Sequence, residues 1–205
     1  ITEDVTLQEI YDNVIEEYAD EFENKGISFS AFISGDRNAL LRLDMSKSRR
    51  VLSNVFSNCV KHLTGEKKLV EVRFSSDKEK IYITVDDSGE GVNEDKLELI
   101  FEPLYTSDKG RKVAGLGLAI CREITELHNG KIYAQPSHLG GLRVCIELDR
   151  EELKKQKKGP FDKQGPADEK YASLYYKCIS VMRSQLYSPE GKIKNIWSTP
   201  DRLPH

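Results

Sequence analysis

Two asparagines one helical turn apart could ligate a metal ion that is held by phosphates. Asn54 and Asn58 lie in residues 44–64, DMSKSRRVLSNVFSNCVKHLT, where apolar residues recur at helical spacing. Lys61 and His62 continue the same stripe of the predicted helix. Amide oxygens are hard donors, and Mg²⁺ prefers oxygen ligands together with phosphates. The alternative is a solvated helix face. Asparagine has only a moderate helix propensity, so two asparagines one turn apart count against this alternative.

A glycine pair could bring the backbone close to an anion. Gly115 and Gly117 lie in residues 112–120, KVAGLGLAI, and open an apolar run that predicts a helix over 116–128. Glycine permits close approach of a ligand, and the first turn of a helix offers unpaired N–H groups and a partial positive charge. Glycine pairs before helices often only turn the chain, so this motif needs support from other stretches.

A carboxylate follows directly on a predicted strand at 80–86. The strand alternates apolar and polar residues and runs into Asp87, Gly89 and Gly91 of the stretch DDSGEGV. Such a carboxylate can accept a hydrogen bond from an amino group while the glycine backbone passes close to a flat ring. The alternative is an ordinary turn, because Asp, Ser and Gly are common turn residues, and in isolation the stretch favours that alternative.

Residues 100–112, IFEPLYTSDKGRK, combine an apolar, aromatic segment with a polar, basic loop that leads to Gly115. Loops of this length between elements are often lids. Lys109 and Arg111 could contact phosphates, and the alternative is a solvated charge cluster. We expect residues 103–114 to form a lid over a bound anion.

These four stretches follow one another in the order of one protein family. The chain resembles the catalytic, ATP-binding domain of sensor histidine protein kinases, within the wider group of DNA gyrase B, Hsp90 and MutL. SNVFSNCVKH resembles the N box, DDSGEGV the G1 box, IFEPLY the F box and GLGLAICREITELHNGKI the G2 box. The resemblance covers roughly residues 1–149, and four ordered motifs make it specific.

The resemblance implies a site for MgATP. It makes Asp87 the acceptor of the adenine amino group, with Gly89 and Gly91 beside the ring. It makes Asn58 a ligand of Mg²⁺ and places Asn54 near the metal and the phosphates, so that these two are the catalytic residues. The ATP-binding residues that the resemblance implies are Asn54, Asn58, Lys61, His62, Asp87, Gly89, Gly91, Val92, Phe101, Lys109, Arg111, Gly115, Leu116, Gly117 and Leu118.

The chain departs from the family pattern at several positions. His62 stands where the family usually has an aromatic residue near the adenine or the ribose, whereas Lys61 matches a basic residue that reaches the phosphates. Leu104 replaces the second aromatic residue of the F box, and residues 138–144, HLGGLRV, resemble the family's final G-x-G-T segment only loosely. We expect these changes to affect the lid and the affinity rather than the fold.

Asn54 also indicates the reaction. Relatives that hydrolyse ATP carry a glutamate there as the general base, and a neutral amide cannot take a proton at neutral pH. We therefore expect transfer of the γ-phosphoryl group to a histidine on a separate dimerisation and histidine-phosphotransfer domain. A response regulator receiver domain is the expected second partner. The alternatives are a nucleotide-binding switch module and a serine-phosphorylating kinase of the same fold.

The predicted architecture is an α/β two-layer sandwich of the Bergerat type, with a mixed, mostly antiparallel sheet and three helices on one face. The apolar periodicities predict helices at 5–24, 46–63, 94–99 and 116–128. They predict strands at 27–34, 39–43, 69–76, 80–86, 130–136 and 142–149. Val5 is assigned to the apolar stripe of the first helix.

Composition favours a domain in the cytoplasm. The chain of 205 residues has a net charge of −3, no signal peptide and no apolar run near the ~18 residues of a membrane span. The cysteines predict reduced thiols rather than a disulfide framework. His128 and His138 are interpreted as surface or loop residues. We expect no nucleic-acid partner and a parent protein that is associated with a membrane.

Beyond the domain, residues 150–166 are charged and rich in glycine and proline, which predicts a linker. Residues 167–187 carry apolar side chains at helical spacing and predict an amphipathic helix within a C-terminal extension at 167–205. That helix either packs on its own domain, which we favour, or docks on a partner.

Overall fold

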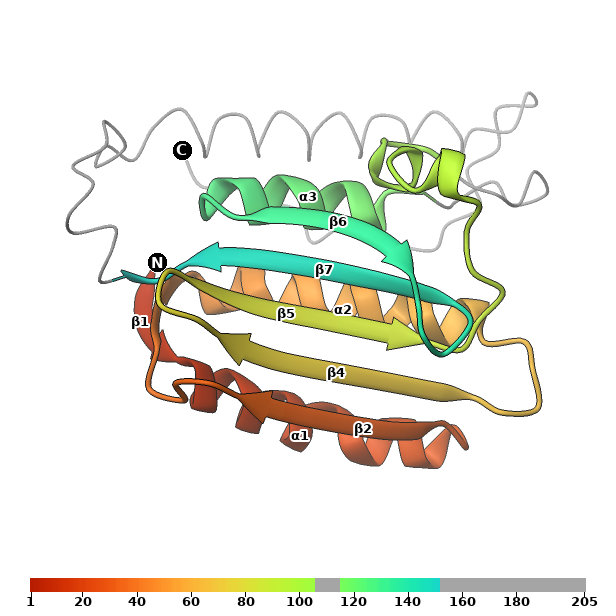
Figure 1. Cartoon of the computed structure of the whole chain (residues 1–205), viewed down its shortest axis with the longest axis horizontal. Coiled ribbons are helices and arrows are strands. Elements are labelled where there is room, and N and C mark those ends of the chain that lie inside the picture. The colour runs from red at the N-terminus through yellow and green to blue at the C-terminus, as the bar shows by residue number, and fades with distance from the viewer. Residues whose placement is uncertain (106–114, 152–205) are drawn as a thin grey trace, which may run out of the picture.

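The computed structural model describes residues 1–105 and 115–151, and the structural statements below concern these residues. They form two layers, a sheet and a set of helices that covers one of its faces (Figure 1). Most of the predicted lid, with Lys109 and Arg111, and the predicted linker and extension from residue 152 onward lie outside the described residues.

The main sheet has five strands in the order β2-β4-β5-β7-β6. Only the β2–β4 pair is parallel, and the other neighbours are antiparallel. This confirms the predicted mixed, mostly antiparallel sheet. The strands are β2 (Ser28–Ser34), β4 (Leu69–Ser76), β5 (Lys80–Asp87), β6 (Lys131–Pro136) and β7 (Leu142–Asp149).

Three helices pack on one face of this sheet, as predicted. They are α1 (Leu7–Asn24), α2 (Met45–His62) and α3 (Gly117–Leu127). Aromatic rings join α1, α2 and β2, with the Tyr18 and Phe56 centroids 4.6 Å apart and the Phe22 and Phe29 rings stacked at 4.9 Å. This packing holds α2 firmly against the sheet, so the asparagines of α2 project from a fixed surface.

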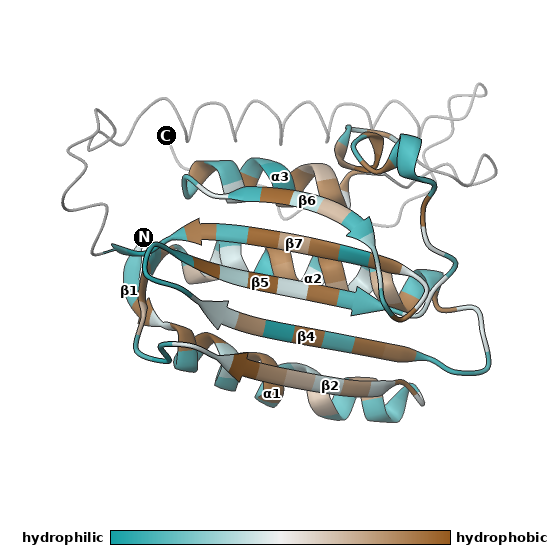
Figure 2. Cartoon of the chain, in the orientation of Figure 1, coloured by the Kyte–Doolittle hydropathy of each residue, from teal (hydrophilic) through white to brown (hydrophobic). Residues whose placement is uncertain are grey.

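Alternation along the strands decides which residues face the helices (Figure 2). In β5, Ile81, Ile83 and Val85 are buried in the core, and the intervening residues point to the outer face. The same alternation directs Asp87 to the helix side and Asp86 to the outer side. Two consecutive carboxylates therefore lie on opposite faces of the sheet.

The assignment of Val5 to the first helix is wrong. Val5 lies in β1 (Glu3–Thr6), which pairs antiparallel with β3 (Leu40–Leu43) in a separate two-stranded sheet. Thr6 is the N-cap of α1, and its hydroxyl accepts from the Glu9 N–H while the Glu9 carboxylate accepts from the Thr6 N–H. This capping box ends the strand and starts the helix between Thr6 and Leu7.

Two further predictions need correction. The helix at 94–99 is replaced by two short 3₁₀ turns, η1 (Glu94–Lys96) and η2 (Leu99–Phe101). His128 is buried rather than exposed, because its Nε2 accepts from the Asp44 N–H at 3.1 Å and its Nδ1 lies 2.8 Å from the Ile124 carbonyl. His128 thus ties the end of α3 to the start of α2.

The described residues also include Arg150 and Glu151, both of which are buried against the domain. Arg150 donates to the Asp36 carboxylate at 2.7 Å and to the Asp77 carbonyl at 3.0 Å.

Among the helices of residues 1–105 and 115–151, none has the length and apolar character that a bilayer crossing requires.

Candidate functional site

Asp87 ends β5 on the helix side of the sheet, and its side chain is only 3% exposed. Its Oδ1 accepts from the backbone N–H of Gly89 at 2.8 Å and of Leu142 at 3.2 Å. Burial raises the pKa of Asp87, and these two backbone donors and the Cys59 thiol oppose that rise. A carboxylate has about four acceptor positions, so Asp87 retains the capacity to accept from a ligand.

The loop after Asp87 lies against the end of α2. A Cβ at Gly89 would stand 2.7 Å from the His62 carbonyl oxygen, so no larger residue fits there. Gly91 has a φ of +70°, which favours glycine. His62 Nδ1 lies 3.0 Å from the Glu90 carboxylate, which links the side chains of α2 and this loop. The half-buried Val92 packs on the hydrophobic core.

Asn54 lies on the side of α2 that meets α3. Asn54 is half-buried, and its Nδ2 donates to the Gly117 carbonyl at 3.3 Å. Asn58 is also half-buried one turn later, and Lys61 is exposed at the end of the same helix. The structure thus places the polar stripe of α2 between the Asp87 loop and the start of α3.

The N-terminus of α3 differs from those of α1 and α2. Thr6 and Asp44 cap α1 and α2 through their side chains. In α3, the N-cap Leu116 makes no side-chain hydrogen bond, and the helix begins directly at Gly117. An N-cap without a side-chain oxygen, together with the partial positive charge of this helix end, suits an anion. Leu118, in the same turn, is buried and holds the helix on the core.

The aromatic segment before the predicted lid is anchored to α3. Phe101 is 1% exposed, and the Arg122 guanidinium lies 4.8 Å from its ring centroid. Arg122 also pairs with Glu98 at 2.6 Å and with Glu102 at 3.3 Å. These contacts fix the turn that leads into the segment 106–114.

The two described ends of that segment meet backbone to backbone. The Leu104 N–H donates to the Gly115 carbonyl at 2.9 Å. Gly115 has a φ of +100°, and a Cβ there would lie 2.3 Å from the Tyr105 carbonyl oxygen. The backbone crossing by itself therefore requires glycine at 115.

Two functional groups of the site were not expected. The Leu142 N–H, which holds Asp87, belongs to the segment that resembled the family pattern only loosely, and a backbone donor leaves no signal in residue type. The Cys59 thiol reaches Asp87 from the core side of α2, where a cysteine reads as an ordinary buried residue. None of the predicted site residues lines the two cavities beside the first turns of α2.

Comparison with known proteins gives consistent findings. Residues 44–152 match the model of a family described as "Histidine kinase-, DNA gyrase B-, and HSP90-like ATPase". The sensor histidine kinase CpxA of Escherichia coli K12 is 33% identical over 159 residues, which cover 72% of this chain and 32% of CpxA. The sensor protein PhoQ of the same strain is 32% identical over 148 residues, covering 69% and 28%. The chain thus spans about a third of the length of these relatives.

Solved structures agree with the sequence comparisons. The nucleotide-free catalytic domain of histidine kinase ThkA superimposes with a TM-score of 0.64 at 25% identity, over 73% of this chain and 98% of that domain. Full-length ShkA in complex with AMPPNP superimposes with a TM-score of 0.61 at 25% identity, over 73% of this chain and 31% of ShkA.

Proposed function

Because the chain belongs to the histidine kinase-, DNA gyrase B- and HSP90-like ATPase family, we propose that it binds MgATP and donates the γ-phosphoryl group to a histidine of a separate domain. The relatives in the sequence comparison are sensor kinases, and ShkA was solved with AMPPNP, an analogue of ATP. The matched residues cover 32% of CpxA and 28% of PhoQ, and in our proposal the receiving histidine lies on another domain.

The observation that carries the proposal is the convergence of three groups from distant parts of the chain. Helix α2 connects these groups, because the Cys59 thiol reaches the buried Asp87 carboxylate and Asn54 donates to the Gly117 carbonyl at the start of α3. Asp87 and the Gly89 backbone would hold the adenine amino group and ring. The α3 terminus, with Gly115 and Gly117, would hold the phosphates.

Asn58 is the proposed Mg²⁺ ligand, and Asn54 stands near the phosphates. When bound at Asn58, Mg²⁺ would supply positive charge that neutralises the charge developing on the γ-phosphoryl group. Asn54 is held by its bond to the Gly117 carbonyl and carries no group that can deprotonate water. A site that positions the phosphates without a base of its own suits transfer to a supplied nucleophile.

The transfer is tested with a separately purified dimerisation domain of a sensor kinase that bears the acceptor histidine. We expect radiolabel from γ-labelled ATP on that domain, stable in base and lost in acid, as a phosphohistidine is. Asp87→Asn should prevent the labelling at low ATP. Acid-stable, base-labile label on serine, or no label on any supplied domain while ATP still binds, would contradict the transfer and favour the serine kinase or the switch module.

The metal role is tested by calorimetry with and without Mg²⁺. Asn58→Ala should reduce the gain in ATP affinity that Mg²⁺ provides and leave adenosine binding nearly intact, because adenosine has no phosphates. Ser57→Ala, at an exposed neighbouring position of α2, is the matched control. An equal effect of Mg²⁺ on all three proteins would show that Asn58 is not a ligand.

The partners follow from the same proposal. The dimerisation and histidine-phosphotransfer domain of the parent protein would receive the phosphoryl group, and a response regulator receiver domain would take it next. The proposed location is the cytoplasm, where ATP is available.

A further inference from the structure

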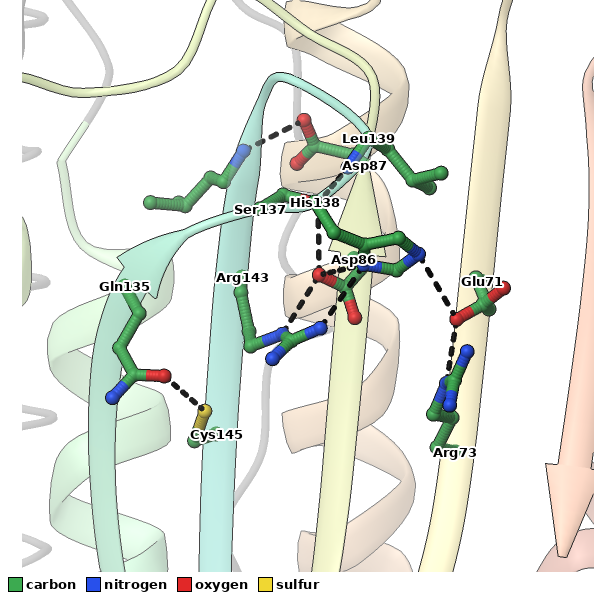
Figure 3. Close-up of polar contacts among 11 residues, drawn as sticks. Glu71, Arg73, Asp86, Asp87, Gln135, Ser137, His138, Leu139, Arg143 and Cys145 are labelled. Atoms are coloured by element: carbon green, nitrogen blue, oxygen red, sulfur yellow. Dashed lines mark hydrogen bonds and ion pairs between the residues drawn. The ribbon is translucent and has the colours of Figure 1, made fainter.

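A row of charged residues crosses the outer face of the sheet, behind the proposed nucleotide site. Strand register places Glu71 of β4 opposite Asp86 of β5, and Asp86 opposite Arg143 of β7. Figure 3 shows the turn between β6 and β7 folded over this row, with His138 above Asp86. The turn covers Asp86 so fully that its side chain is 0% exposed.

Asp86 is the centre of this cluster. Its Oδ1 accepts from the Ser137 hydroxyl at 2.8 Å and from Arg143 Nε at 2.8 Å, and His138 Nδ1 lies 3.3 Å away. The bond to Asp86 raises the pKa of Arg143, which keeps that guanidinium charged. The Asp86 carboxylate is therefore the acceptor on which the turn and β7 converge.

The cluster is electrically balanced. Glu71 Oε1 pairs with Arg73 Nε at 2.6 Å, and Asp86 pairs with Arg143. Glu71, Asp86 and His138 present possible metal-ligand atoms within 4.8 Å of one another. Because each carboxylate already has an arginine partner, an added divalent cation would meet two positive charges, and we interpret the cluster as a structural clamp.

The turn that this clamp holds also reaches the inner face. The Gly141 N–H donates to the Asp87 carbonyl at 3.1 Å, and the Leu142 N–H donates to Asp87 Oδ1 at 3.2 Å. The fit is tight, since a Cβ at Gly141 would stand 2.1 Å from Asp87 Oδ1. One turn therefore contacts Asp86 with its side chains and Asp87 with its backbone.

The Ser137 hydroxyl connects the turn to Asp86. This hydroxyl accepts from the Leu139 N–H at 3.1 Å within the turn and donates to the Asp86 carboxylate on the outer face of the sheet. Inside the turn, the Ser137 N–H donates to the Gly141 carbonyl at 2.9 Å. The position of Ser137 thus sets the position of Gly141, and so of the donor that follows it.

We propose that Asp86, Ser137 and Arg143 are positioning residues that hold the Leu142 N–H against Asp87 and thereby orient the Asp87 carboxylate toward an adenine amino group. This inference rests on the proposed role of Asp87 and extends it to the outer face of the sheet. The three residues contact no nucleotide themselves and act through the turn.

The test compares two ligands in the full chain. One is ADP, and the other is the diphosphate of purine riboside, which lacks the exocyclic amino group. Ser137→Ala should weaken ADP binding by about three- to tenfold and binding of the purine riboside diphosphate by less than about twofold. Ser137→Thr, which keeps the hydroxyl, should restore ADP binding. Tyr133→Phe removes a hydrogen bond to Glu147 elsewhere on the same face and is the matched control.

Two further measurements separate positioning from loosening of the fold. The Leu142 amide should exchange faster in Ser137→Ala than in the parent chain, while the amides of β4 keep their rates. In the Asp87→Asn background, Ser137→Ala should have no further effect on ADP affinity, because the group that it positions is gone.

Each outcome decides a different point. If Ser137→Ala leaves ADP affinity and Leu142 exchange unchanged, the positioning role is wrong. If both ligands weaken equally, the clamp only stabilises the fold, and the role is again wrong. If Asp87→Asn itself binds ADP like the parent chain, the proposed adenine site fails first and independently.

Discussion

Asp86 and Asp87 are neighbours in the sequence, but their side chains lie on opposite faces of the sheet. Both are buried, and both end β5. Asp86 faces outward and accepts from two side chains, the Ser137 hydroxyl and the Arg143 guanidinium. Asp87 faces the helices, and its two recorded backbone donors both reach one oxygen. The first is a structural carboxylate that is paired with Arg143, and the second is, in our proposal, the carboxylate that accepts from a ligand.

In our proposal, Asp87 is a binding group that is kept available in a buried place. Side-chain cations would neutralise Asp87 and compete with a ligand, whereas backbone N–H groups fix its direction and add no full charge. Burial of a carboxylate without a cationic partner has a cost, which is the raised pKa of Asp87. The turn at residues 137–141 serves both carboxylates, so the two faces of the sheet are mechanically coupled.

The largest expected effect comes from Gly141→Ala, which disturbs both faces at once. The added Cβ would lie 2.1 Å from Asp87 Oδ1 and 2.5 Å from the Gly89 nitrogen, so the turn must move. We expect a loss of about 3 kcal/mol of unfolding free energy, as for a strongly overpacked site, and loss of measurable ADP binding. Denaturant unfolding and calorimetry measure the two effects.

Gly65→Ala is the control for this substitution. A Cβ at Gly65 would meet no atom closer than 4.0 Å, and its φ is not in the left-handed region. We expect its stability to stay within about 0.5 kcal/mol of the parent chain. Equal stabilities of the two variants would mean that the turn is not packed on Asp87 as described.

The second prediction separates the two carboxylates by their opposite effects on stability. Asp87→Asn should weaken ADP binding by about tenfold or more, which corresponds to about 1.4 kcal/mol. It should also leave the melting temperature of the free protein unchanged or higher, because it removes a carboxylate whose ionised form burial disfavours. Asp86→Asn should lower stability by about 1–2 kcal/mol, because Arg143 loses its charged partner.

Thermal unfolding of both variants without nucleotide gives the comparison. A lower melting temperature for Asp87→Asn than for Asp86→Asn would reverse the assignment of structural and functional carboxylate.

The third prediction concerns pH. Burial raises the pKa of Asp87 in the folded protein, so the folded state binds this proton more tightly than the unfolded chain does, and stability increases as the pH falls through the folded-state pKa. The proposed adenine contact needs the ionised acceptor, so ADP affinity should fall over the same range, at a higher pH than an ordinary aspartate with its pKa near 3.9 would give. Calorimetry from about pH 7 to pH 4 measures this. The Asp87→Asn variant corrects for titration of the ADP phosphates, and parallel curves for the two proteins would contradict the prediction.

The sequence predicts those parts of the structure whose signals are local. The strand predictions at 69–76 and 80–86 match β4 and β5 within one residue, because inward and outward residues alternate in both. The helix prediction at 46–63 differs from α2 by one residue at each end. Gly91 also has a local reason, because its φ of +70° is in the left-handed region that favours glycine.

The parts that escaped prediction depend on partners far away in the chain. Val5 lies in a strand of four residues, too short for a clear period, and its pairing partner is β3. The capping box of Thr6 and Glu9 would have predicted that the helix starts directly after Thr6. His128 is buried because it meets Asp44, 84 positions away, and Asp86 because a turn 51 positions later covers it. No residue type signals such contacts.

The smallest expected effect tests the support of Asp87 from the core side. The Cys59 thiol is buried, its pKa is raised well above 9, and it hydrogen-bonds to Asp87, so it stays protonated and lowers the pKa of that carboxyl. A thiol is a weak donor. Cys59→Ala should therefore weaken ADP binding at neutral pH only about twofold, with the acid loss of affinity moved to higher pH. Cys121→Ala is the matched control, because that buried thiol donates to the Val51 carbonyl instead. Both variants lose a similar apolar group, so they should lose similar stability. If Cys121→Ala changes ADP affinity as much as Cys59→Ala does, the effect reflects a looser core, and the orientation of Asp87 depends on the turn alone.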